Sequence, residues 1–270
     1  MKKLLSILLI CTVFISCEKD DVPFDPAPGQ PMDDRRSVLI KDIMAEKLPN
    51  PYYNFKYDTA KYVTEVSFAS NLSVYKVEYE NKRVKKLKNI KNGHNILYTY
   101  TENLVTKIDE YNLGNLHVYS YELSYNASGR LAQITWKEFF DDPSGIVIKK
   151  VVFSYQPDGN LYKLETYLVE SGVLTLSSTR KYSDYDDKTN VDDFYVMMDF
   201  FDTFLFLPQV KLQLNNPRKE LINGGLNEFD ITYTYEFNNN LPIRKIIDLH
   251  QTKGDHAGQK GHFINQFTYY

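Results

Sequence analysis

Residues 122–136 read ELSYNASGRLAQITW, and this stretch decides how the chain folds. Apolar and polar residues alternate up to Tyr125, which is typical of a strand with one buried face. The turn-like residues Asn-Ala-Ser-Gly follow, and apolar residues come next at Leu131 and Ile134. Asn and Gly adopt the positive φ angles that tight turns require. The stretch therefore predicts a β-hairpin.

The same pattern recurs along the chain, with two apolar residues six and nine, or five and eight, positions after an aromatic residue. The aromatic residues that begin the seven copies are Tyr57, Tyr79, Tyr100, Tyr125, Tyr155, Tyr185 and Phe237. Their apolar residues are, in the same order, Val63 and Val66, Val84 and Leu87, Val105 and Ile108, Leu131 and Ile134, Leu161 and Leu164, Val191 and Phe194, and Ile243 and Ile246. The three-residue step between the two apolar positions breaks strict alternation, and a β-bulge would accommodate it. We expect about seven repeated hairpins.

The two ends of the repeat region supply half units. Residues 37–43 (SVLIKDI) read as a leading strand, although an amphipathic helix over 35–48 is the alternative. Residues 263–270 (FINQFTYY) read as a closing strand. The fold class we expect is all-β, an antiparallel meander in a strongly twisted, barrel-like or spiral sheet.

One long insertion interrupts the repeat. The copies at Tyr185 and Phe237 lie 52 residues apart, whereas the others lie 21 to 30 apart. The apolar residues after Asp193 recur at helical spacing, either Asp192 or Asp193 suits a helix cap, and Pro208 suits a helix end. We predict an inserted helix over about 192–207 packed on the sheet, with an exposed groove for a partner as the alternative.

The repeated pattern resembles the YD (Rhs-type) repeat, whose Tyr-Asp pair stands here at Tyr57-Asp58 and Tyr185-Asp186. The layout of residues 37–270 resembles a family of Bacteroidetes-type lipoproteins of unknown function that are described as porin-like. This resemblance implies a repetitive β-domain and brings no activity with it. Because the strands lack a consistent apolar outward face, we do not expect them to span a membrane.

The N-terminus reads as a secretion signal, MKKLLSILLICTVFISC. Two lysines precede an apolar run that is shorter than the ~20 residues of a membrane-spanning helix. The ending FISC resembles the lipobox of bacterial lipoproteins. This resemblance implies cleavage after residue 16, a diacylglycerol on the thiol of Cys17 and an acyl chain such as palmitate on its amine. An ordinary signal peptide with an incidental cysteine is the alternative.

The residues after Cys17 resemble an export signal. Lys19, Asp20 and Asp21 match the lysine-plus-acid motif that directs Bacteroidetes-type lipoproteins to the outer face of the outer membrane; a solvated charge cluster is the alternative. Residues 18–36 are rich in proline and aspartate and read as a tether that reaches ~60 Å when extended. The expected domains are a signal peptide at 1–16, the lipidated cysteine and tether at 17–36, and one β-domain at 37–270.

Three polar clusters are candidate sites. His250, His256 and His262 recur every six residues and suggest either a metal site or a polar hairpin loop. The acidic residues of 184–193 (DYDDKTNVDD) suit calcium, or a turn and a helix cap. The basic run at 81–94 suits a strand edge that resists pairing, or a site for acidic glycans.

Other residues raise the possibility of sugar chemistry. The pairs Glu138 with Asp141, and Asp199 with Asp202, could serve a glycosidase if they lay at the required separation. Trp136 and the many tyrosines could stack on sugar rings, or could pack in the core and across strands.

The sequence contains no common catalytic motif, and it predicts no cofactor. Its formal charge of −3 gives no basic surface for nucleic acid. We therefore expect a non-enzymatic, lipid-anchored binding or scaffold protein of the outer membrane, exposed at the cell surface. Its partners would be the membrane and either a glycan or another envelope protein. A glycan-binding accessory protein of a polysaccharide-uptake system is the first alternative, and a glycoside-active enzyme is the second.

Overall fold

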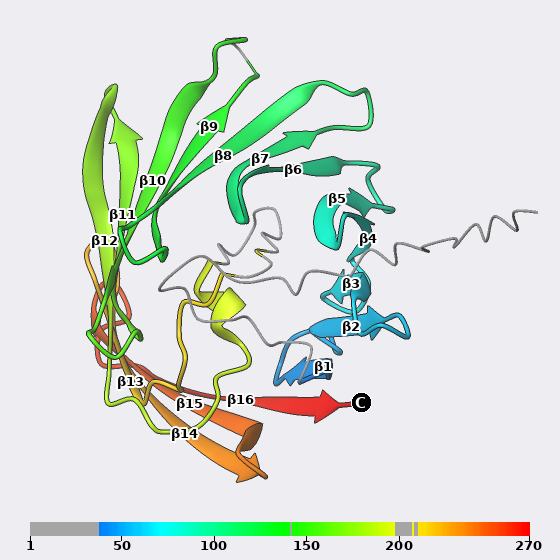
Figure 1. The fold of residues 1–270 in the computed structure, drawn as a ribbon. Coiled ribbons are helices and arrows are strands. Elements are labelled where there is room, and N and C mark those ends of the chain that lie inside the picture. The colour runs from blue at the N-terminus through cyan, green and yellow to red at the C-terminus, as the bar shows by residue number, and fades with distance from the viewer. Residues whose placement is uncertain (1–37, 141, 198–206, 208–209) are drawn as a thin grey trace, which may run out of the picture.

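The computed structural model describes residues 38–140, 142–197, 207 and 210–270, which form one antiparallel sheet closed into a sixteen-stranded barrel (Figure 1). The strands are β1 (Ile40–Ala45), β2 (Tyr53–Tyr57), β3 (Val63–Phe68), β4 (Ser73–Glu80), β5 (Arg83–Asn89), β6 (Asn95–Thr101), β7 (Leu104–Tyr111), β8 (His117–Tyr125), β9 (Leu131–Glu138), β10 (Ile146–Tyr155), β11 (Leu161–Glu170), β12 (Val173–Ser183), β13 (Lys219–Asn223), β14 (Glu228–Asn238), β15 (Leu241–Lys253) and β16 (Lys260–Tyr269). Each strand pairs with its sequence neighbours, and β1 pairs with β16 to close the ring. The prediction of an all-β, barrel-like meander is therefore confirmed.

The stretch at 122–136 forms the β8–β9 hairpin with the expected bulge. Tyr125 lies opposite Leu131 and Ser124 lies opposite Gln133, so Ala132 is the additional residue. The bulge turns both apolar residues of the copy, Leu131 and Ile134, into the buried interior.

The turn explains why an Asp or Asn follows the tyrosine. The side-chain oxygen of Asn126 accepts hydrogen bonds from the amides of Ser128 and Arg130, each at 3.0 Å. Gly129 has a φ of +72° and allows the chain to reverse there. Asp58 accepts from the amides two and four residues after it, each at 2.9 Å. This residue therefore builds the turn rather than a chemical site.

The tyrosine hydroxyls link each hairpin to the one before it. Each hydroxyl donates to the backbone carbonyl of the first or second residue of an earlier strand. These tyrosine–carbonyl bonds, which we call the tyrosine ladder, are Tyr57 to Ile40 (3.0 Å), Tyr79 to Val63 (2.9 Å), Tyr100 to Val84 (2.8 Å), Tyr125 to Val105 (2.8 Å), Tyr155 to Leu131 (2.8 Å), Tyr185 to Leu161 (2.6 Å) and Tyr269 to Pro242 (2.5 Å). Burial raises the pKa of Tyr79, Tyr100, Tyr125 and Tyr155, so these hydroxyls stay protonated and donate at neutral pH.

The two faces of the barrel wall differ in polarity. The interior-facing residues of the first eleven strands are mostly apolar and form one continuous core. On the outer face, Glu65 on β3 binds Lys56 of β2 at 2.7 Å and also pairs with Lys76 of β4. Hydrogen bonds from these two lysines lower the pKa of Glu65, so the carboxylate stays charged well into the acid range. Ion pairs between neighbouring strands therefore cover this part of the outer wall.

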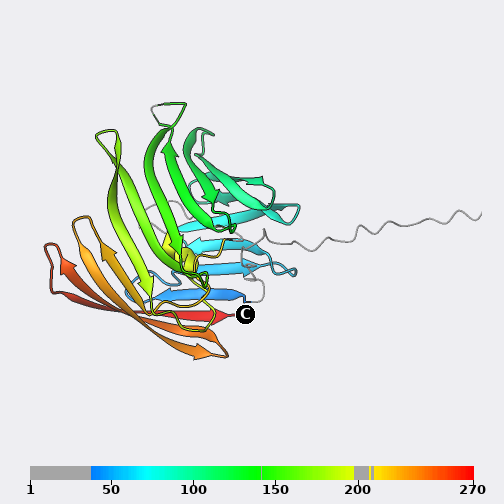
Figure 2. The ribbon, with the colours of Figure 1, turned by 60° about the vertical axis from the view of Figure 1, so that its left-hand side comes forward.

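The turns of the barrel lie alternately at its two ends. The near rim contains the turns that follow the even-numbered strands, together with Val38 and Tyr270 at the ends of the described chain. The far rim contains the turns that follow the odd-numbered strands. Strands β10–β12 and β14–β16 have 10 to 13 residues, and the β11–β12 and β15–β16 hairpins project at the far rim (Figure 2).

Two copies of the repeat depart from the sequence prediction. The copy at Tyr185 does not fold back as a hairpin, because Val191 and Phe194 lie in the long connection and the return strand is β13. The copy at Phe237 is shifted by one residue, because Asn239 and Asn240 form a two-residue turn with φ of 48° and 67°.

The shift in the last copy changes which side chains face inward. Phe237 lies opposite Pro242, and exposed Ile243 occupies the bulge. Ile246 then lies on the outer face opposite Thr234, and Lys245 takes the inward position.

The remaining elements agree with the sequence in part. Residues 40–45 form a strand, so the strand interpretation of the first element is confirmed. Within the helix predicted over 192–207, the described residues form a five-residue 3-10 helix, η1 (Asp193–Met197). Residues 198–206 and Pro208 lie outside the described residues. No helix in the described part of the chain is long and apolar enough to span a membrane.

The tyrosine ladder predicts a specific loss of stability. Replacing Tyr125 with Phe keeps the packed ring but removes the 2.8 Å hydrogen bond to the Val105 carbonyl. We expect Tyr125→Phe to lower the free energy of unfolding by about 1–2 kcal/mol, measured by urea denaturation. The matched control is Tyr162→Phe, whose ring is 44% exposed and which should change stability by less than about 0.5 kcal/mol. Equal stabilities would contradict the role assigned to the ladder.

Candidate functional site

Residues 184–218 connect β12 to β13, and we call them the insert; their described residues, 184–197, 207 and 210–218, lie inside the barrel (Figure 1). Figure 1 shows the described part of the insert, with η1, in the middle of the ring. It contacts three separate parts of the wall. Phe194 packs on β2, the carbonyl of Leu212 accepts from the amide of Leu161 on β11 at 3.1 Å, and Asp192 pairs with Lys245 on β15. The insert therefore bridges opposite sides of the barrel.

Aromatic rings fasten η1 to the start of the barrel. The ring of Phe194 lies edge-on to Tyr53 and Phe55, with centroid distances of 5.3 and 5.9 Å. The ring of Tyr195 stacks on Tyr52 at 6.4 Å and 10°. The prediction that this apolar stripe faces the core is consistent with these contacts, because Phe194 and Val196 are buried.

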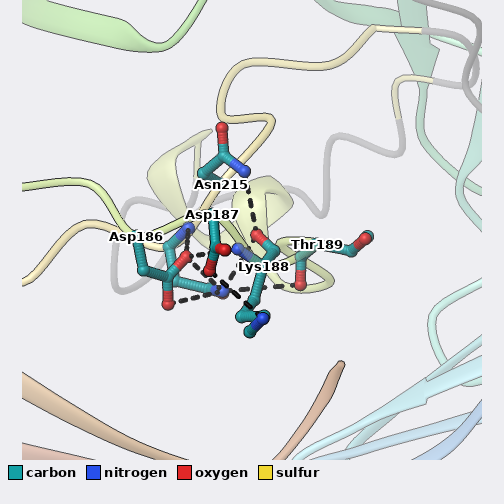
Figure 3. Close-up of polar contacts among 6 residues, drawn as sticks. Asp186, Asp187, Lys188, Thr189 and Asn215 are labelled. Atoms are coloured by element: carbon teal, nitrogen blue, oxygen red, sulfur yellow. Dashed lines mark hydrogen bonds and ion pairs between the residues drawn. The ribbon is translucent and has the colours of Figure 1, made fainter. Parts of the chain in front are cut away.

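A hydrogen-bonded network joins the two arms of the insert (Figure 3). The carboxylate of Asp186 accepts from the amide of Lys188 at 3.0 Å and from the amide and side chain of Asn216 at 3.1 Å each. The side chain of Asn215 donates to the Lys188 carbonyl at 3.1 Å, and Thr189 forms an isolated bridge with Asn215. The carboxylate oxygens of Asp186 are therefore occupied by hydrogen bonds from Lys188 and Asn216, which join the two arms of the insert.

The returning arm is also tied to the near rim. Asn160, buried in the β10–β11 turn, accepts from the amides of Leu214 and Asn215 at 2.9 Å each. Its side-chain N–H donates to the Asn215 side chain at 3.1 Å. Because these bonds replace water at buried polar groups, they fix the insert in position.

Two buried ion pairs complete the attachment. Lys245 of β15 lies 3.0 Å from Asp192, and the two side chains are 12% and 3% exposed. Lys211 donates to the Asn190 carbonyl at 2.7 Å and lies 3.3 Å from Asp193. The carboxylate of Asp193 also accepts from the Leu212 amide at 2.7 Å. Asp192 and Asp193, which the sequence suggested as helix caps, thus pair with lysine side chains, and Asp193 also accepts from a backbone amide.

The wall beside the insert carries a third charged cluster. Arg180 on β12 lies 2.5 Å from Glu220 on β13, and the Tyr233 hydroxyl of β14 donates to the same carboxylate. Burial, together with the adjacent Glu220 charge, raises the pKa of Tyr233, so the hydroxyl remains a donor. The guanidinium also lies over the ring of Tyr182 at 5.7 Å. This cluster joins three strands on the inner face.

Sequence reasoning missed Arg180, Glu220 and Lys245. Arg180 precedes Tyr182 by two residues, so strand alternation alone places both on one face. Lys245 comes eight residues after Phe237, which is the inward position when the turn has two residues. If Asn239 and Asn240 are taken as a two-residue turn, the sequence therefore predicts that Lys245 faces inward.

The acidic and histidine clusters do not converge on a metal. Among the described residues, no group of three or more histidine, cysteine, aspartate or glutamate side chains is arranged to hold a metal ion. The β15–β16 hairpin forms as expected, but His250 lies opposite Lys260 and His262 lies opposite Asp248, at 2.7 Å. His256 is in the turn, where its ring contacts Gln259.

The acids of residues 184–193 disperse in a similar way. Asp184 pairs with Lys219 at 2.7 Å, and Asp187 pairs with the adjacent Lys188 at 3.3 Å. Of these acids, Asp186, Asp192 and Asp193 attach the insert through the contacts described above.

The basic run at 81–94 does not form a strand edge. β5, which contains four of its six Lys and Arg residues, pairs with β4 and β6 inside the closed ring, so the edge interpretation is wrong. Lys85 and Lys86 pair with Glu80 and Glu78 on β4, at 2.6 and 3.3 Å. These cations belong to the polar outer wall.

Trp136 is a core residue. Its side chain is buried, and its ring lies 4.8 Å from Tyr121 and 5.8 Å from Tyr119. Lys149 lies over the ring at 5.1 Å. The suggestion that Trp136 stacks on a sugar is therefore wrong.

Several predicted site residues lie outside the described residues. They are Cys17, Lys19, Asp20, Asp21, Asp141, Asp199 and Asp202. The two carboxylate pairs proposed for glycosidase chemistry therefore have no described geometry.

The fold is shared with two solved structures. A porin-like protein from Bacteroides uniformis superposes with a TM-score of 0.58 at 15% identity, covering 81% of this chain and 89% of that one. A porin-like protein from Bacteroides vulgatus superposes with a TM-score of 0.56 at 13% identity, covering 86% of this chain and 99% of that one. No protein-family model matches the chain, and no curated protein matches it in sequence. At these identities the likeness concerns the fold.

The ion pair between Lys245 and Asp192 gives a prediction with an internal control. Lys245→Met leaves Asp192 buried and uncompensated, so we expect a loss of about 3 kcal/mol in the free energy of unfolding. Adding Asp192→Asn should recover at least about 1 kcal/mol, because the unpaired charge is removed. The measurement is a double-mutant cycle by urea denaturation.

The control is the adjacent residue on the outer face. Arg244 pairs with Glu236 at 2.8 Å, and the two side chains are 35% and 49% exposed. Arg244→Met should therefore cost less than about 1 kcal/mol. Equal losses at Lys245 and Arg244 would contradict the attachment role of the inner pair.

Proposed function

We propose that this chain is a lipid-anchored envelope protein whose barrel stands in water and acts as a non-enzymatic binding or scaffold module. The polarity of the barrel wall carries the proposal. Charged residues such as Lys56, Glu65 and Lys76 pair on the outside, and apolar residues fill the inside. A membrane-spanning barrel has the opposite arrangement, with an apolar band toward lipid and a polar interior. The observed wall suits an aqueous setting.

The filled interior supports a module that binds through its outer surfaces. The insert crosses the barrel, and its acids Asp192 and Asp193 are held by Lys245 and Lys211. Charged groups that are neutralised by buried partners serve packing more readily than proton transfer. The arrangement therefore favours a structural role for these groups.

The location rests on the N-terminal sequence. The signal with Cys17 supports a lipid anchor, and Lys19, Asp20 and Asp21 support transfer to the cell surface. The origin of the two similar structures in Bacteroides, and their description as porin-like, is in keeping with an envelope setting. The described chain begins at the near rim, so the anchored segment would leave the barrel there.

Glycan binding has less support. A sugar-binding face would place several exposed aromatic rings side by side. The most exposed aromatic side chains among the described residues are Phe140, Tyr162, Phe263 and Tyr270, which lie in different turns and strands. The distribution favours another class of ligand.

Acylation of Cys17 is directly testable. Cells grown with an alkyne-labelled palmitate should label the protein, and Cys17→Ala should abolish the label because the thiol and the cleavage signal are lost. Cys11→Ala is the matched control, since Cys11 lies within the signal and should leave labelling unchanged. Mass spectrometry of the N-terminal peptide should place the new terminus at residue 17. Labelling that persists in Cys17→Ala would contradict the anchor.

Surface exposure has its own test. Replacing Lys19, Asp20 and Asp21 together with Ala should reduce digestion of the protein by protease added to intact cells. The fraction that sediments with membranes should stay unchanged, because the anchor is intact. Undiminished digestion would show that these three residues do not direct export.

A further inference from the structure

The far rim concentrates the exposed apolar residues of the molecule. Seven large apolar side chains among the described residues are at least 60% exposed, and six of them lie in or beside far-rim turns. These six, which we call the apolar rim, are Leu72, Leu113, Leu116, Phe140, Val173 and Leu226, with exposed fractions from 60% to 88%. Single exposed apolar residues are ordinary, but a set gathered at one end of a barrel indicates contact with an apolar partner.

Turn geometry does not account for these residues. In the β3–β4 turn, Ala69, Ser70 and Asn71 adopt the positive φ angles, and Leu72 follows them. In the β11–β12 turn, Ser171 and Gly172 do so, and Val173 follows. The residues that shape the turns are thus small or polar, and the apolar residue beside them is an addition that the turn does not require.

Most turns of the apolar rim also lack charge. The turn segments 69–72, 112–116, 171–172 and 224–227 contain no Lys, Arg, Asp or Glu, and the turn beside Phe140 is the exception. Asp58, Lys82, Glu102, Arg130 and Asp158 each place a charge in a near-rim turn, and the far-rim turns outside the apolar rim contain Glu46, Lys47, Lys91 and Asp255. The uncharged turns of the far rim are therefore the ones that carry most of the apolar rim.

We propose that the apolar rim inserts into the surface of a lipid bilayer. Its members are spread over separate turns with mostly uncharged tips, a form that enters a fluid interface without requiring a complementary shape. A protein partner of comparable affinity would call for a continuous, close-packed patch with a polar margin. Because most of the tips are uncharged, insertion should depend on apolar burial and should persist at high salt.

The length of the chain before the barrel is compatible with this contact, a step that rests on the proposed lipid anchor. The described chain begins at the near rim with Val38. Residues 18–36 could extend to ~60 Å, whereas a ten-residue strand spans only about 33 Å. A barrel held through Cys17 could therefore lay its far rim on the same bilayer.

The test measures the depth of the rim in lipid. The full-length protein carrying Leu226→Cys is labelled with a fluorophore and reconstituted in vesicles of phosphatidylethanolamine and phosphatidylglycerol with brominated acyl chains. We expect bromine quenching of this label at least about twofold stronger than that of a label at Tyr162→Cys on the near rim. Quenching should be unchanged in high salt. Equal quenching at the two positions would overturn the proposal.

A second variant separates insertion from mere proximity. A label at Ser171→Cys reports the depth of the rim while Leu72, Leu113 and Leu226 are replaced together by Ser. Its quenching should fall to the near-rim level, and unchanged quenching would count against the apolar rim. If the labels are shielded from lipid but quench one another, the apolar rim contacts a second copy of the chain. That outcome would also overturn the proposal.

Failure of the anchor can be recognised separately. Mass spectrometry of the same preparation reports acylation, and centrifugation reports association with the vesicles. Unacylated protein that still shows the Leu226 quenching supports the rim and overturns the anchor. Acylated protein that sediments with vesicles but shows no such quenching overturns the rim alone, and unacylated protein that stays in solution overturns both.

Discussion

The hydrogen bond from a tyrosine hydroxyl to the carbonyl of the preceding hairpin is the interaction on which the rest of the structure depends. Backbone ladders join neighbouring strands in any sheet, but they leave the register of successive hairpins to side chains. Here the bond from Tyr125 to Val105, and its equivalents, fixes each hairpin against the one before it. Where Phe237 lacks a hydroxyl, Tyr235 donates instead to the Pro217 carbonyl at 3.1 Å. The ring can therefore close at Ile43 and Phe267 with a consistent register.

Much of this architecture could be predicted from the sequence, because hairpins are local. The spacing of Tyr125, Leu131 and Ile134 within one short stretch indicates the strand pairing, the bulge and which side chains face inward. The prediction failed where a turn was misjudged by one residue, at Asn239 and Asn240. A shift of one residue exchanges the faces of a strand, so Ile246 was expected inside in place of Lys245.

The contents of the barrel could not be predicted in the same way. The apolar residues around Phe194 signalled burial, but the residues that receive them belong to β2, far away in sequence. The acids at Asp192 and Asp193 resembled a calcium cluster or a helix cap because their lysines, Lys245 and Lys211, are also distant. Local spacing describes which residues could act together, and the closed ring decides which ones meet.

The pairing of β1 with β16 has a consequence for how the protein is made. The first strand has no partner on one side until the last strand has been synthesised. A growing chain therefore presents two open sheet edges, one on β1 and one on its newest strand, and both can pair with other chains. Folding that waits for β16 is slow, and it avoids such pairing if the nascent polypeptide is kept unfolded until β16 has been made, as happens when a chain is threaded through a membrane.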